Sequence, residues 1–145
     1  MIDATLPIGV FDSGMGGLTV LRALQAELPS ESFIYLGDSA RLPYGNKSIA
    51  TVQQYALQTS AALVDRGIKA LVVACNTASA AALPLLVGKY APLPVFGVIE
   101  PGAQAAAHAA CGSVVLVLAT EGTVMDGTYQ RALLAADADL TVYAR

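Results

Sequence analysis

The chain has 145 residues, of which 55% are hydrophobic and only 13% charged, and its formal net charge at pH 7 is -3. This composition excludes a disordered chain, because so much apolar surface can offset the ordering entropy. The length suits one domain with a real core. The 8 Lys and Arg residues, against 11 Asp and Glu, form no basic block, so no nucleic-acid partner is expected.

A mean hydropathy of +0.59 raises the question of a membrane. Residues 70–88 and 101–120 carry no formal charge, but polar residues, Pro and Gly interrupt both windows. A spanning helix needs ~20 predominantly apolar residues, so no membrane partner is expected. The start of the chain does not have the basic segment followed by an apolar stretch that is typical of a signal peptide. The two cysteines suit a reducing compartment. We therefore expect a cytoplasmic protein.

Short apolar segments of strand length recur along the chain. They are rich in Val and Ile and nearly continuous, which is typical of strands buried on both faces of a parallel sheet. The predicted strands are residues 8–11, 33–36, 70–74, 95–99, 114–119 and 140–143.

Helical patterns separate these segments. Leu residues at helical spacing predict a helix that stops at Pro29, and Ser48 is expected to cap a long helix ending near Arg66. Pro101 suits the first turn of a helix ending before Gly112, and Asp126 opens a last helix through Ala136. Alternating strands and helices predict an α/β fold with a doubly wound parallel sheet.

A doubly wound sheet binds ligands beyond the carboxyl ends of its strands. Polar or Gly-rich segments follow the predicted strands, and they are expected to converge on one edge. These segments are residues 12–17, 37–45, 75–79, 100–102 and 120–123.

The first of these segments partly fits a dinucleotide-binding fingerprint. Gly14 and Gly16 have the required spacing, and Asp38 follows the second strand at a suitable distance. However, Thr19 occupies the third small position, and Asp12 places an anion where a pyrophosphate would approach. A tight strand-to-helix turn that needs glycine explains the pattern at least as well.

Cys75 lies at the end of a predicted buried strand, directly before a predicted helix. A helix N-terminus stabilises a thiolate, and the neighbouring Asn76 and Thr77 are donors that suit a carboxylate. A free cysteine is more commonly a small buried hydrophobe. Because Asp12 and Ser13 are expected at the same edge, we favour a reactive thiol.

Other chemistries have weaker support. No metal-ligand spacing is present, and His108 is expected on a helix surface, which also argues against a Cys–His hydrolase dyad. Cys111 precedes the fifth strand at the opposite edge and is taken as structural. No lysine has an evident buried setting for pyridoxal chemistry; the three are Lys47, Lys69 and Lys89.

Five segments together resemble the glutamate racemases, which act without a cofactor and supply D-glutamate for peptidoglycan. Cys75-Asn76-Thr77 also resembles aspartate racemases, whereas the opening Asp12-Ser13-Gly14 segment points to the glutamate branch. The matching segments are residues 11–20, 37–45, 74–79, 97–101 and 119–124.

The resemblance implies that Cys75 is one of two acid/base thiols, which remove and return the Cα proton on opposite faces. Asp12 is expected to assist this proton transfer or to pair with the substrate ammonium. The implied substrate contacts come in three pairs: Asp12 and Ser13, Tyr44 and Gly45, and Asn76 and Thr77. The implied substrate is glutamate, and the full-length protein is expected to be a homodimer.

The sequence also departs from the family pattern. The family's second cysteine lies in a later Gly-Cys-Thr-His-Tyr-Pro segment that is absent here, and Cys111 has different neighbours. We therefore expect residues 1–98 to form a first domain and residues 99–145 to begin a second, truncated one. The 145 residues alone are expected to be inactive. Two alternatives remain open at this point, a dinucleotide-binding module and a non-catalytic glutamate-binding fragment.

Overall fold

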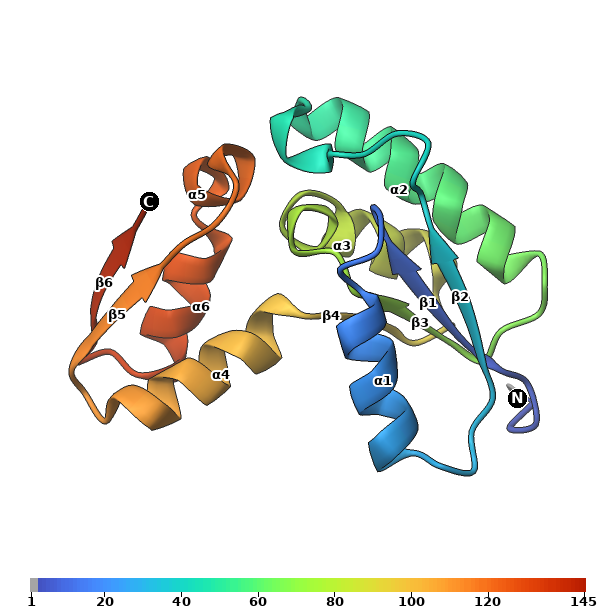
Figure 1. Cartoon of the computed structure of the whole chain (residues 1–145), viewed down its shortest axis with the longest axis horizontal. Coiled ribbons are helices and arrows are strands. Elements are labelled where there is room, and N and C mark those ends of the chain that lie inside the picture. Colours follow the sequence, from blue (N-terminus) through green and yellow to red (C-terminus); the bar gives the residue numbers. More distant parts are fainter. Residues whose placement is uncertain (1–2) are drawn as a thin grey trace.

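The computed structural model describes residues 3–145, which form two parallel sheets with helices packed against them (Figure 1). The first sheet has the order β2-β1-β3-β4, and its strands are β1 (Ile8–Asp12), β2 (Phe33–Gly37), β3 (Ala70–Val73) and β4 (Val95–Gly97). Every neighbouring pair in it is parallel. Since the chain leaves β1 for β2 on one side and reaches β3 on the other, the order reverses between β1 and β3.

Helices cover both faces of the first sheet (Figure 1), and alternate strand residues explain how. Val10 and Val72 face one side, where α1 (Leu18–Glu27) packs. Phe11 and Val73 face the other side and pack with the helices there, which are α2 (Ile49–Val64) and α3 (Asn76–Tyr90). The prediction of a doubly wound parallel sheet is confirmed.

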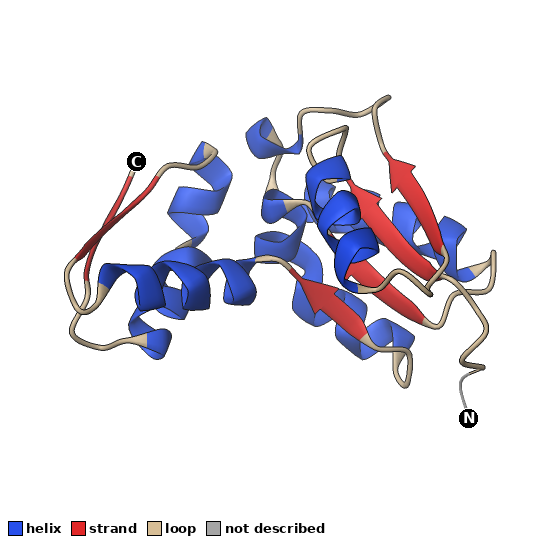
Figure 2. Cartoon of the chain, turned by 60° about the horizontal axis from the view of Figure 1, so that its bottom comes forward, coloured by secondary structure: helices blue, strands red, loops and turns tan. Residues whose placement is uncertain are grey.

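The remainder of the chain forms a second, smaller layered unit, joined to the first through the helix after β4 (Figure 2). Its sheet contains two parallel strands, and its core lies between this sheet and two of its helices. The elements are α4 (Ile99–Ala110), β5 (Val114–Val117), α5 (Glu121–Asp126), α6 (Thr128–Ala136) and β6 (Thr141–Ala144).

The predicted strands match the observed ones to within one or two residues, and Ser48 caps α2 by accepting a hydrogen bond from the Thr51 amide. The prediction that Pro101 lies in the first turn of a helix ending before Gly112 is confirmed, since α4 begins at Ile99 and ends at Ala110. One helix start was predicted wrongly. Asp126 ends α5 rather than opening a helix, since the left-handed Gly127 (φ 71°) separates α5 from α6.

Candidate active site

The point where the strand order reverses brings Asp12 and Cys75 to one edge of the sheet. The Ala74 amide donates to the Phe11 carbonyl at 2.7 Å, so the chain segments leaving β3 and β1 run side by side. A cleft of about 640 Å³ opens above this edge. Among the residues that line it are Asp12, Ser13, Gly14, Cys75, Asn76, Thr77 and Thr120.

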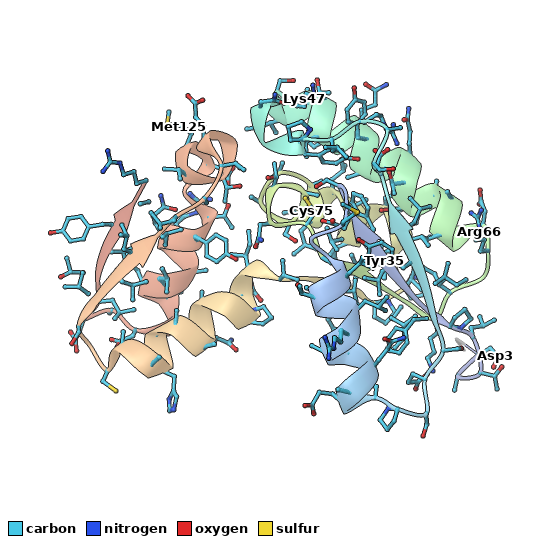
Figure 3. All side chains as sticks on the ribbon, in the orientation of Figure 1. Asp3, Tyr35, Lys47, Arg66, Cys75 and Met125 are labelled. Carbon is cyan, nitrogen blue, oxygen red and sulfur yellow. The ribbon has the colours of Figure 1, made fainter. Side chains whose placement is uncertain are left out.

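Cys75, labelled in Figure 3, is the N-cap of α3. Its side chain is only 5% exposed. Its Sγ accepts a hydrogen bond from the Ala78 amide at 3.4 Å, and the thiol donates to the Ser13 Oγ at 3.2 Å. An amide donor at a helix N-terminus stabilises negative charge on the sulfur, and the serine hydroxyl can donate to a thiolate once the proton has left. The sulfur is therefore suited to gain and lose a proton.

Asp12 is buried and anchored by the loop that follows it. Its Oδ2 accepts a hydrogen bond from the Gly14 amide at 2.9 Å. The Tyr35 hydroxyl of β2 donates to the Gly14 carbonyl at 3.0 Å and lies 3.5 Å from the Asp12 Oδ2. Burial, with a smaller contribution from the Asp12 charge, raises the pKa of Tyr35 to about 12, so this phenol stays a donor at neutral pH.

Tyr35 was missed by sequence reasoning. It lies inside a predicted strand and is followed there by Leu36 and Gly37, so no local pattern distinguishes it from a packing residue. Only the parallel pairing of β1 with β2 places its side chain beside the loop after Asp12.

Asn76 and Thr77, at the start of α3, contact residues from the second unit. The Thr77 Oγ1 lies 3.2 Å from the Thr120 Oγ1 and 3.5 Å from that of Thr123. The Tyr129 hydroxyl donates to the Asn76 Oδ1 at 2.6 Å. Thr120 and Thr123 lie in a segment expected at this edge, whereas nothing in the sequence singled out Tyr129.

Tyr44 and Gly45 do not line the cleft. The Tyr44 side chain is buried in the core between Phe11 and Tyr55, and burial, together with the bound Asp38, raises the pKa of its phenol. Gly45 lies behind the cleft wall, because a Cβ built on it would come 2.4 Å from the Thr120 Cγ2. The structure therefore does not bring this predicted pair to the cleft.

The Asp38 carboxylate is engaged within the protein. Its Oδ2 accepts a hydrogen bond from the Tyr44 hydroxyl at 2.5 Å and pairs with the Arg41 Nε at 2.6 Å. The dinucleotide alternative needs this carboxylate for a ribose, so the geometry does not favour it.

His108 and Cys111 both lie on the surface of the second unit, outside the cleft. Cys111 ends α4 in the left-handed region (φ 48°). Within residues 3–145, no group of three or more His, Cys, Asp or Glu side chains is placed to share a metal ion. Over the same residues, no helix has the length and apolar character needed to cross a membrane.

The sequence profile of the Asp/Glu/Hydantoin racemase family matches residues 9–144. The chain belongs to this family. It is 52% identical over 131 residues to a glutamate racemase of Thermus thermophilus, a match that covers 90% of this chain and 49% of the relative.

Solved structures of racemases in this family have the same fold. A glutamate racemase isoform from Bacillus anthracis superposes with a TM-score of 0.91 at 43% identity, covering 98% of this chain and 53% of that one. The glutamate racemase of Francisella tularensis, solved in complex with D-glutamate, gives 0.88 at 41% identity, covering 97% and 52%. The chain thus spans about half the length of the racemases it matches.

Proposed function

We propose that the whole protein carrying this sequence is a glutamate racemase that interconverts L- and D-glutamate without a cofactor. The observation that carries this proposal is the setting of Cys75, a thiol at a helix N-terminus that bonds to Ser13 in a cleft shared with Asp12. The similarity to glutamate racemases supports the choice of substrate.

Inversion at Cα requires a base on one face of the carbon and an acid on the other. In the proposed reaction, the Cys75 thiolate removes the Cα proton and becomes a thiol. A second thiol, from the part of the family pattern that this chain lacks, then donates its proton to the opposite face and becomes the thiolate. No proton is gained or lost overall, and the reverse direction exchanges the two roles.

The rest of the cleft has matching chemistry. Donors at the start of α3, from Asn76 and Thr77, suit a substrate carboxylate. The backbone amides and the Thr77 hydroxyl among them are proposed to oppose the charge that develops on deprotonation. Asp12 has the charge to pair with the substrate ammonium or to assist the proton transfer. Tyr44 and Gly45 are proposed as substrate contacts on the family resemblance alone, since neither lines the cleft in this structure.

The family resemblance also supports proposals about the domain organisation, the oligomeric state and the cellular role of the whole protein. Residues 1–98 are assigned to a first domain and residues 99–145 to the start of a second, a division supported by the two separate sheets. The whole protein is proposed to be a cytoplasmic homodimer that supplies D-glutamate for peptidoglycan and thus for cell shape. Sedimentation of the whole protein tests the dimer.

Substitutions of Cys75 and Cys111 in the whole protein provide a matched test of the proposed mechanism. Cys75→Ala is expected to abolish racemisation, followed as loss of optical rotation from L-glutamate without added pyridoxal phosphate. Cys111→Ala, at an exposed helix end, is expected to keep full activity. Turnover retained by Cys75→Ala would exclude the proposed mechanism. Thermal stabilisation by NAD but not by glutamate would instead favour the dinucleotide-binding alternative.

A further inference from the structure

The hydroxyl of Tyr129 lies 2.6 Å from the Oδ1 of Asn76, and the two residues come from different units of the molecule. Tyr129 belongs to α6, and Asn76 is the first residue of α3. We propose that Tyr129 is a positioning residue, which orients the Asn76 amide so that its Nδ2 group faces the substrate cleft. This inference rests on the proposed function, because it assigns the Asn76 amide to a substrate carboxylate.

Asn76 lies between two cavities. One is the cleft that contains Cys75. The other, of about 420 Å³, is lined by Tyr129 and by residues of α4 and β5. Asn76 thus lines both the cavity beside Tyr129 and the cleft that contains Cys75.

The chemistry of the two groups fixes which end of the amide faces Tyr129. An asparagine amide has one acceptor oxygen and one donor nitrogen, and its partners decide its orientation. Burial raises the pKa of Tyr129, so its hydroxyl keeps its proton at neutral pH and donates to the Oδ1. Within residues 3–145 the Nδ2 protons of Asn76 have no protein acceptor, which leaves them for a ligand.

The orientation matters because a carboxylate only accepts hydrogen bonds. With Oδ1 held by Tyr129, the cleft presents an N–H donor to it. Without the phenol, the amide can rotate and present its oxygen, which repels the carboxylate. Losing one neutral hydrogen bond of this kind corresponds to about a two- to tenfold change. The effect should fall on substrate binding, since the Asn76 amide transfers no proton.

The experiment compares Tyr129→Phe with Tyr143→Phe in the whole protein. Tyr143 is an exposed tyrosine of β6 that makes no side-chain hydrogen bond within the described residues, so it controls for loss of a phenol. Tyr129→Phe should raise the KM for glutamate about two- to tenfold and leave kcat within about twofold. Tyr143→Phe should change neither value.

A second pair of variants separates positioning from general packing. If Tyr129 acts through Asn76, then Tyr129→Phe should have no further effect on KM in an Asn76→Ala background. Asn76→Asp, which replaces the donor with an acceptor of the same shape, should raise KM more than Asn76→Ala does. An equal effect of Tyr129→Phe in both backgrounds, or an unchanged KM, would overturn the inference.

Failure of the inference and failure of the proposed function give different results. If the unsubstituted whole protein does not racemise glutamate, the proposed function fails. Glutamate affinity, measured by calorimetry on the same variants, then still decides the role of Tyr129. A Kd that is the same for Tyr129→Phe and Tyr143→Phe would exclude that role whatever the activity.

Discussion

The Cys75 thiol donates a hydrogen bond to the Ser13 hydroxyl, with 3.2 Å between the sulfur and the oxygen, although the two residues are 62 positions apart in the chain. Cys75 follows β3 and Ser13 follows β1, and these strands are neighbours in the first sheet. The bond therefore depends on the parallel register that brings both strand ends to one edge.

Ser13→Ala should make Cys75 less reactive, because the variant lacks the hydroxyl that can stabilise the thiolate. We expect the rate of alkylation by iodoacetamide near neutral pH to fall about three- to tenfold, corresponding to one hydrogen bond. The measurement uses the 145-residue chain in a Cys111→Ala background, so that Cys75 is its one remaining cysteine. Ser30→Ala, a serine in the loop before β2, is the control. Equal rates for the two serine variants would contradict the role given to Ser13.

Gly37→Ala should destabilise the fold, since a Cβ at this position would lie 2.1 Å from the Gly14 carbonyl oxygen. The strand or the active-site loop must then move, at a cost of about 1–3 kcal/mol in the free energy of unfolding. Gly88→Ala in α3 is the matched control, because a Cβ there contacts nothing within 4 Å. That helical substitution should stabilise the protein by about 0.5–1 kcal/mol. Denaturant unfolding of both variants checks the opposite signs.

The phenol of Tyr35 should ionise late in an alkaline titration. Its pKa in the folded protein is raised from 10.0 to about 12, chiefly by burial, so the folded state binds the proton more tightly than the unfolded state does. Its contribution to stability is complete below pH 10 and is lost as the pH rises toward 12. Tyrosinate absorbance of the unsubstituted protein minus that of Tyr35→Phe should isolate this step. A step centred near the ordinary value would show that the phenol is not buried against the Asp12 loop.

Leu116→Lys should reduce self-association of the isolated 145-residue chain. Leu116 and its register partner Tyr143 are 58% and 60% exposed on the outer face of the two-stranded sheet, beside Val114 at 61%. A contiguous exposed apolar patch of this kind promotes association. Ile49→Lys, at a site on α2 that is 52% exposed, is the control. Sedimentation should show a larger monomer fraction for Leu116→Lys alone, and equal fractions would exclude this face as the cause.

Local patterns in the sequence determined much of the fold. Continuous apolar segments located the six strands of the described residues. Burial on both faces explains this for β1 and β3 but not for β5 and β6, which expose alternate side chains. The position of Cys75 between a buried strand and a helix N-terminus was likewise predicted, and Cys75 is the N-cap of α3. The division between α5 and α6 escaped notice, because a left-handed glycine such as Gly127 leaves the apolar periodicity on either side unchanged.

Which side chains meet at the site depends on the packing of elements that lie far apart in the chain. Tyr35 and Tyr129 reach the loop after Asp12 and the start of α3 from elements far away in the chain, and each lies among residues that only suggest packing. Tyr44, by contrast, has its side chain in the core. The alternation of strands and helices and the position of Cys75 can be predicted from local sequence, since burial and capping act over a few residues. The partners of these groups depend on strand order and on how the two units pack, which arise from many weak contacts between distant segments.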